Sequence, residues 1–363
     1  MWPEPTCSQQ SITSHCPALF KVNLYPLFVS PAIPGITESH KPDKLLTMAT
    51  LIPKPLPPQA ERLVAAGLQT QILVPADAEY EAREDSYWSN SAKIKPACIV
   101  RPRSAEEVST AVKALVAAGD KFAVRSGGHT QWAGSNNIHE GVTIDLSLLN
   151  QTVYDAASET ASIGPGGRWR EVYAELHKFG RVVAGGREGN VGVAGLLLGG
   201  GKTFYTARKG FACDNVVEYE VVLADGQIVK ANKDDYSDLF RVLKGGSNNF
   251  GIVTNFKMSA IECDKVWGGM TFFPKDVIPA ALEAVFNFTN NVPNDTDSNL
   301  VCIATYLPDF KDIVIATLYA NVAGVVEPAA YKEWLAIPNM MTTVKMTSVS
   351  EMAFEYNIPP QHQ

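Results

Sequence analysis

Apolar and polar residues along the chain follow two spacings, which together predict a mixture of strands and helices. Short runs rich in Val, Ile, Phe and Tyr that are bounded by Gly, Pro or Asp are typical of strands. Such runs predict strands at residues 95–102, 121–125, 142–147, 152–157, 160–164 and 250–258, and a strand pair at 214–231. Helical spacing predicts helices at residues 58–67, 105–118, about 168–179 and 234–246. Ser104 followed by Glu107 forms a capping box for the second of these helices, and Gly119 stops it.

The composition shifts after about residue 263 and predicts a second unit. Strands are expected at residues 267–274, 300–308 and 312–321, and helices at 276–291 and 328–338. This order indicates an α+β fold and not a regular series of βαβ units. We therefore predict domains at residues 58–264 and 265–363. Residues 1–57 would be a disordered or wrongly assigned extension, with Met48 as an alternative start.

Composition and charge exclude several classes of function. The chain has 31 basic and 38 acidic residues, a net charge of −7, and no basic run, so nucleic-acid binding is not expected. Its six cysteines are scattered without a C-x-x-C pair, which argues against a zinc site or a disulfide framework. No apolar stretch reaches the roughly 18 residues that a membrane span needs. Oligomeric state is not indicated.

Localisation signals point in two directions. Residues 19–34 are apolar but interrupted by polar residues and prolines, and no basic residue precedes them, so they make a poor secretory signal. That favours a cytoplasmic protein. Glycosylation sequons at Asn150, Asn287 and Asn294 favour secretion instead. The sequence leaves the localisation open.

Glycines dominate two segments that follow strands. SGGHT at 126–130 follows a predicted strand, and residues 185–201 contain eight glycines, too many for a good helix by propensity. Two such turns can point several backbone N–H groups at a phosphate. A G-x-G-x-x-G fingerprint is absent, and GKT at 201–203 has Leu196 where a P-loop requires glycine. Taken alone, Gly127 and Gly128 would only predict a tight turn capped by His129.

Four blocks give these glycines a more specific meaning. VRSGGHT at 124–130, GNVGVAGLLLGGG at 189–201, GFACDNVVEYEVVLADG at 210–226 and LKGGSNNFGIVTNFKM at 243–258 resemble the berberine bridge enzyme-like oxidases. These are FAD-linked oxidoreductases of the vanillyl-alcohol oxidase and p-cresol methylhydroxylase flavoprotein superfamily. The resemblance covers about residues 80–265. It implies a two-subdomain FAD-binding domain, followed by a substrate domain with an antiparallel sheet that is truncated in this chain.

The resemblance also implies which residues bind the cofactor. The pyrophosphate would be wrapped by Arg125, Ser126, Gly127, Gly128 and Thr130. The ribityl and phosphate region would be lined by Asn190, Gly192, Val193 and Gly195, and the adenosine side by Gly251, Ile252 and Val253. His129 would be bonded through a ring nitrogen to the 8α carbon of the flavin. Some family members carry a second bond from a cysteine, but Glu188 occupies that position here, so a single attachment is expected.

The implied reaction is the oxidation of a small molecule in secondary metabolism. Hydride would pass to flavin N5 and the electrons then to O₂, with a base from the substrate domain removing a proton. The candidates for this base are Tyr306, Glu351, Glu355 and Tyr356. One alternative is a truncated, catalytically inactive FAD-binding remnant, because the chain ends within the substrate domain. A nicotinamide-dependent reductase is disfavoured by the missing fingerprint.

Overall fold

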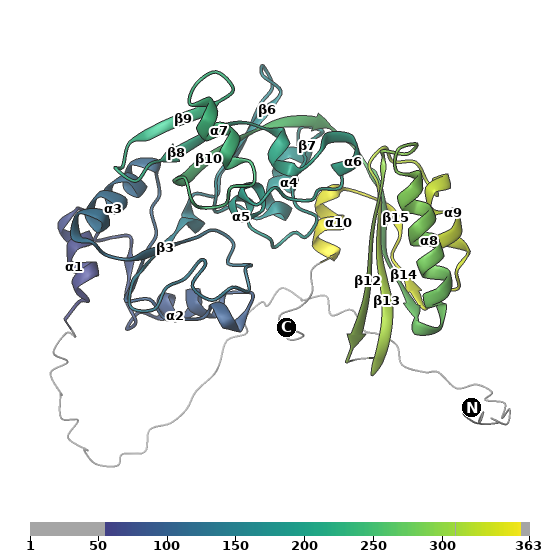
Figure 1. The fold of residues 1–363 in the computed structure, drawn as a ribbon, viewed down its shortest axis with the longest axis horizontal. Helices are drawn as coiled ribbons and strands as arrows, with labels where there is room; N and C mark the ends of the chain where they lie inside the picture. Colours follow the sequence, from purple (N-terminus) through teal and green to yellow (C-terminus); the bar gives the residue numbers. More distant parts are fainter. Residues whose placement is uncertain (1–54, 309, 357–363) are drawn as a thin grey trace, which may run out of the picture. The chain divides into compact units, whose positions relative to one another are not determined.

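A computed structural model describes residues 55–308 and 310–356. These residues form helices and mainly antiparallel sheets, which confirms the predicted α+β class (Figure 1). The extension predicted for residues 1–57, including Met48, lies outside the described residues except for 55–57, and α1 begins at Pro58. No helix within the described ranges combines the length and apolar character needed to cross a membrane.

The first sheet places the first glycine turn at the end of a parallel strand. Its strands have the order β1-β2-β4-β3, and β2 and β3 both run parallel to β4. They are β1 (Ile72–Leu73), β2 (Cys98–Val100), β3 (Phe122–Arg125) and β4 (Val142–Asp145). The helices of this part are α1 (Pro58–Ala65), α2 (Ala78–Asp85) and α3 (Ala105–Ala118). Ser104 caps α3 by accepting a hydrogen bond from Glu107 N, and Gly119 ends it with φ +69°, as predicted. The capping box is only half formed, because the Glu107 carboxylate accepts from Arg103 N and not from Ser104 N.

The second sheet is antiparallel and contributes residues to the largest hydrophobic core. Its strands have the order β5-β6-β10-β8-β9, and β7 pairs with the far end of β10. They are β5 (Thr152–Asp155), β6 (Thr160–Ile163), β7 (Arg181–Val183), β8 (Val216–Val222), β9 (Ile228–Asn232) and β10 (Ile252–Glu262). The helices are α4 (Trp169–His177), α5 (Val193–Leu198), α6 (Thr206–Lys209) and α7 (Ser237–Leu243). Cys213 is buried beside the start of β8.

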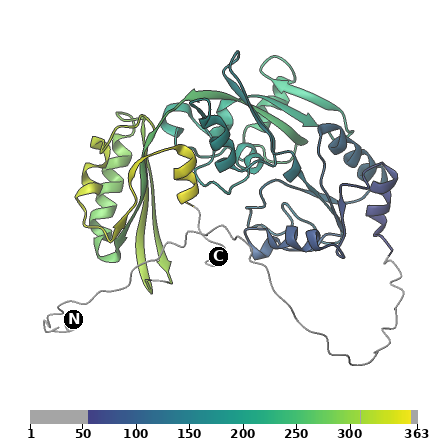
Figure 2. The ribbon, with the colours of Figure 1, turned by 180° about the vertical axis from the view of Figure 1, so that it is seen from behind.

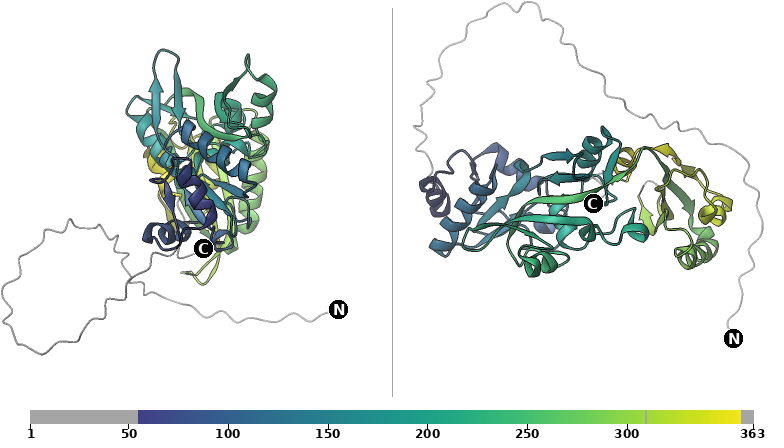
Figure 3. Two further views of the ribbon diagram at one scale, coloured as in Figure 1. Left: turned by 90° about the vertical axis from the view of Figure 1, so that its left-hand side faces the viewer. Right: turned by 90° about the horizontal axis from the view of Figure 1, so that it is seen from above.

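The third sheet belongs to the unit predicted after residue 264. Its strands have the order β12-β13-β11-β14, with β15 also paired to β11, and all pairs are antiparallel. They are β11 (Val266–Pro274), β12 (Ser298–Leu307), β13 (Asp312–Asn321), β14 (Met341–Thr342) and β15 (Lys345–Thr347). Helices α8 (Ile278–Asn291) and α9 (Lys332–Ala336) cover one face of this sheet (Figures 1 and 2). Figure 3 shows the same strands and helices as two layers.

One expectation about the second glycine-rich segment was wrong. Residues 193–198 form the helix α5 despite the surrounding glycines. Val193 and Leu197 are fully buried in the main core, so tertiary packing offsets the poor helix propensity of Gly195. Outside the helix, Gly189 and Gly199 lie in turns, while Gly185 and Gly186 leave room for the Trp169 ring.

The last described helix packs into the same hydrophobic core as the second sheet. α10 (Val349–Glu355) packs against α4, and Gly189 N donates a hydrogen bond to Ala353 O over 2.8 Å. Met352 and Ala353 are fully buried in the same core cluster as Trp169. This contact ties the end of the described chain to the loop that leads into the second glycine turn.

The two glycine turns touch each other at their backbones. A Cβ on Gly127 would lie 2.5 Å from Gly192 N, and a Cβ on Gly192 would lie 2.5 Å from Gly127 Cα. Gly128 follows with φ +69°, a conformation that favours glycine. A side chain at either contact position would therefore push the turns apart.

This contact predicts a contrast between two glycines of the second turn. Gly192→Ala should lower the free energy of unfolding by about 1–3 kcal/mol, because the new methyl group meets backbone atoms that cannot rotate away. Gly195→Ala is the matched control, since an added Cβ there meets nothing within 4 Å and lies in helix α5. Thermal unfolding followed by tryptophan fluorescence should show a lower Tm for the first variant only. Equal Tm values for the two variants would contradict the contact.

Candidate functional site

A cavity of about 1000 Å³ lies beside the two glycine turns. Its size suits a large organic cofactor. Most of the predicted cofactor-binding residues line it: Ser126, Gly127, Gly128, His129, Thr130, Gly192, Gly195, Gly251, Ile252 and Val253. The structure thus brings together three segments that are far apart in the sequence.

The backbone of the first turn fits an anionic group. Gly127 and Gly128 are buried, and within the described residues their N–H groups donate no hydrogen bond to the protein. Buried N–H groups almost always have a partner, so two neighbouring ones at the wall of a cavity are suited to a phosphate. The donors required for a pyrophosphate are therefore present.

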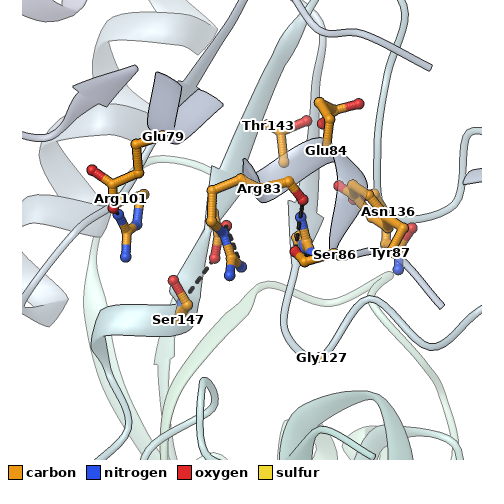
Figure 4. Close-up of polar contacts among 12 residues, drawn as sticks. Glu79, Arg83, Glu84, Ser86, Tyr87, Arg101, Gly127, Asn136, Thr143 and Ser147 are labelled. Atoms are coloured by element: carbon orange, nitrogen blue, oxygen red, sulfur yellow. Dashed lines mark hydrogen bonds and ion pairs between the residues drawn. The ribbon is translucent and has the colours of Figure 1, made fainter. Parts of the chain in front are cut away.

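The Arg125 side chain packs against this turn and does not line the cavity. Its buried guanidinium donates hydrogen bonds to Arg83 O over 2.6 Å and to Ser86 Oγ over 2.7 Å. It also lies 3.7 Å above the centre of the Tyr87 ring. Figure 4 shows Arg83, Ser86 and Tyr87 of this group. The structure places the Arg125 side chain outside the cavity wall, where it holds the turn in position.

The other two predicted residues also lie outside the wall. Val193, the first residue of α5, is buried in the main core, and Asn190 contributes its backbone carbonyl to a hydrogen bond with Arg168. Both residues position the second turn.

Arg168 joins the two turns and was missed from the sequence. Its Nη1 donates to Gly127 O over 2.7 Å and also to Asn190 O. It stands directly before α4, in a position where neither spacing nor residue type distinguishes it from a surface arginine. Burial lowers the pKa of this guanidinium, with further lowering by Arg125 and Arg83.

His129 lies at the cavity wall in a defined environment. Its ring stacks with Trp88, with centroids 6.2 Å apart and planes inclined by 23°. Burial lowers the pKa of His129 to about 4, and the charges of Arg168 and Arg125 add to this effect. The imidazole is therefore neutral near pH 7 and keeps one nitrogen lone pair free for bonding.

Glu188 faces His129 from the second glycine-rich segment. Its Oε2 atom lies 4.0 Å from His129 Nδ1. Burial raises the pKa of this carboxyl group. From the sequence, Glu188 indicated only that the cysteine of a second flavin bond is missing.

The four candidates for the catalytic base lie outside the cavity wall. Tyr306 is exposed on β12, and Glu355 is half-buried on α10. Glu351 caps α10 by accepting hydrogen bonds from Ser348 N and Thr347 Oγ1. Tyr356 is half-buried, and burial raises the pKa of its phenol, with smaller effects from the charges of Arg187 and Glu188. The identity of the base stays a prediction.

Comparison with known proteins agrees with this site. Residues 96–232 match the FAD binding domain family. The chain is 42% identical over 285 residues to the FAD-dependent monooxygenase drtC of Aspergillus calidoustus, covering 77% of this chain and 54% of that protein. It is 41% identical over 305 residues to the FAD-dependent monooxygenase sdcF of Emericella nidulans, covering 82% and 64%. This chain therefore carries an FAD binding domain. It spans between half and two thirds of the length of these two relatives.

Solved structures show the same fold. The glucooligosaccharide oxidase of Acremonium strictum superposes with a TM-score of 0.68 at 22% identity, covering 82% of this chain and 62% of that one. The carbohydrate oxidase of Microdochium nivale gives a TM-score of 0.66 at 25% identity, covering 82% and 64%. Together with the family match, these neighbours confirm the flavoprotein superfamily predicted from the four sequence blocks.

Arg168 provides a test of how this flavoprotein holds its cofactor. Arg168→Lys should weaken FAD binding roughly tenfold, because a lysine ammonium cannot reproduce a guanidinium bridge between two carbonyls. Arg170→Lys is the matched control, since the Arg170 side chain is 39% exposed and pairs with Glu171. The affinity is measured by titrating the apoprotein with FAD and following flavin fluorescence. An Arg168→Lys variant that binds FAD as tightly as the control would contradict the bridge.

Proposed function

We propose that this chain is the FAD-binding part of an oxidase that oxidises a small organic molecule, with FAD bonded to His129. The bound flavin would supply the electron sink, accepting hydride at N5 and passing the electrons to O₂. The observation that carries the proposal is the position of His129 at the wall of a cavity where the N–H groups of Gly127 and Gly128 have no partner within the described residues. Burial, which lowers the pKa of the imidazole to about 4, supports it.

The residues of the chain have separable tasks in this proposal. Gly127 and Gly128 would bind the pyrophosphate, while Arg168 and Arg125 hold their turn in shape. His129 would fix the flavin ring to the wall of the cavity. Permanent attachment of this kind prevents cofactor loss and tunes the electronics of the ring.

A single attachment fits the cysteines in the described part of the chain. None of Cys98, Cys213, Cys263 and Cys302 lines the cavity. The glucooligosaccharide oxidase of Acremonium strictum carries a 6-S-cysteinyl, 8α-N1-histidyl FAD, in which a cysteine forms a second bond. Here Glu188 stands where the second bond would start, so only the histidine bond is proposed.

The names of relatives support the substrate class and the electron acceptor. Fungal relatives include FAD-dependent monooxygenases and the bifunctional solanapyrone synthase of Alternaria solani, which is 36% identical over 277 residues. Structural neighbours include xylooligosaccharide and chitooligosaccharide oxidases. We therefore propose a small-molecule substrate from secondary metabolism and O₂ as the acceptor.

The attachment can be tested by acid precipitation of the purified protein. We expect a yellow pellet whose flavin stays with the peptide that contains His129. In His129→Ala the flavin should move to the supernatant, because the bonding nitrogen is gone. His177→Ala, at an exposed position on α4, is the control and should keep a yellow pellet.

Each other outcome has a definite meaning. A yellow pellet from His129→Ala would place the bond at another residue. A colourless pellet with a yellow supernatant from the unaltered protein would mean that FAD binds without a bond. Protein without any flavin would favour the inactive remnant, and release of hydrogen peroxide with alcohols, amines or sugars would exclude it.

A further inference from the structure

A second cavity lies in the unit that follows residue 264, where strands β11, β13 and β14 meet helix α9 and the neighbouring loops. Its volume is about 180 Å³. This leaves room for roughly six water molecules at about 30 Å³ each, or for one small organic molecule. Within the described chain, it shares no lining residue with the cavity beside the glycine turns.

The cavity lies on the face of the third sheet that is turned away from the main hydrophobic core. Side chains alternate between the two faces along a strand. On β13, Leu318 and Ala320 belong to the main core, whereas Tyr319 between them packs in the smaller core with Trp267 and Trp334. A ligand in this cavity is therefore separate from the proposed flavin site, and the inference does not depend on the proposed function.

Three aromatic side chains form the buried part of the wall. Trp267, Tyr319 and Trp334 line the cavity and are only 4%, 1% and 1% exposed. The ring centroids of Tyr319 and Trp334 lie 6.3 Å apart, with planes inclined by 56°. Such rings offer apolar surface to the C–H groups of a ligand, and aromatic walls with a few polar groups are typical of small-molecule sites.

Trp334 also carries a hydrogen-bond donor without an acceptor. Its Nε1 atom is buried and has no partner within the described residues. An indole N–H can only donate, and a buried donor that stays unpaired costs free energy. Because Trp334 lines the cavity, an oxygen atom held there can supply the missing acceptor.

Glu327 and Asn339 bring acceptors to the entrance of the cavity. Both line it at exposed positions, and in the described ranges neither side chain has an ion pair or a hydrogen bond. Glu327 has φ +49°, which is uncommon for a residue with a side chain. Backbone conformations of this kind gather at ligand sites, because the surrounding structure must hold them in place.

We propose that this cavity binds a small uncharged molecule that carries several hydroxyl groups, a polyol. A hydroxyl group both donates and accepts, so one molecule can donate to Glu327 and Asn339 and accept from Trp334. An anion would be repelled by Glu327. An apolar molecule would leave the polar groups of the wall without partners, and a small cation could not accept a hydrogen bond from Trp334.

The test follows the binding of myo-inositol, a rigid neutral polyol, to the purified protein by saturation-transfer NMR. We expect saturable binding that is the same with and without FAD. Trp334→Phe should weaken it roughly threefold to tenfold, because the aromatic ring stays and the N–H donor is lost. Trp169→Phe is the matched control, since the Nε1 atom of Trp169 is also buried without a partner in the described residues but lines neither cavity.

A second pair of variants tests the entrance at exposed positions, where a substitution leaves the core intact. Glu327→Ala should weaken binding roughly tenfold, because a hydrogen bond to a charged acceptor is lost. Glu333→Ala is its control, since this exposed carboxylate of α9 bonds to Asn287 and does not line the cavity. It should bind myo-inositol like the unaltered protein.

Charged probes check the chemical class of the ligand. Tetramethylammonium and acetate should both fail to displace myo-inositol. Displacement by tetramethylammonium would indicate a cation site, displacement by acetate an anion site, and either result would overturn the proposal.

The remaining outcomes separate this site from the flavin site. Without saturable binding of myo-inositol the cavity would hold water only, and the proposal would fall. Equal affinities within both pairs of variants would place the polyol elsewhere and overturn it as well. A protein that binds no FAD but still binds myo-inositol through Trp334 and Glu327 would sink the proposed function and support this inference.

Discussion

The candidate site depends on the contact between Gly127 and Gly192. Only two residues without side chains allow these backbones to approach so closely, and a Cβ on either would lie 2.5 Å from the other. Arg168 reinforces the contact by donating from one nitrogen to a carbonyl of each turn. Because one turn follows the first sheet and the other belongs to the second, this contact joins the two halves of the FAD-binding region at the cavity.

The same arginines serve both phosphate binding and the histidine. Although the chain has a net charge of −7, Arg125 and Arg168 lie together beside the first turn. Their positive charges suit a pyrophosphate, and they also help to lower the pKa of His129. Burial is the larger cause of the lowered pKa of His129, and the arginines beside the phosphate site add to it, so the imidazole is in the neutral form that can bond to carbon.

The parts of the site predicted from the sequence are those that depend on local spacing. The turns around Gly128 and Gly192 and the position of His129 could be inferred because glycine requirements and the four sequence blocks are visible along the chain. Arg168 and Glu188 could not be assigned their contacts, since each acts across distances in sequence that only the tertiary structure closes. Helix α5 was missed because buried packing outweighs local propensity. For Glu351, the capping of α10 explains its position, which the sequence had offered as a candidate base.

Hydrogen–deuterium exchange of His129→Ala protein with and without FAD tests the central claim most directly. Without FAD, the amides of Gly127 and Gly128 have no protein partner and should exchange rapidly. If the joined glycine turns hold the cofactor, FAD will slow exchange together in residues 126–130, in 190–196 and in 247–253. Exchange that stays unchanged in both glycine turns, while FAD binds, would contradict the account.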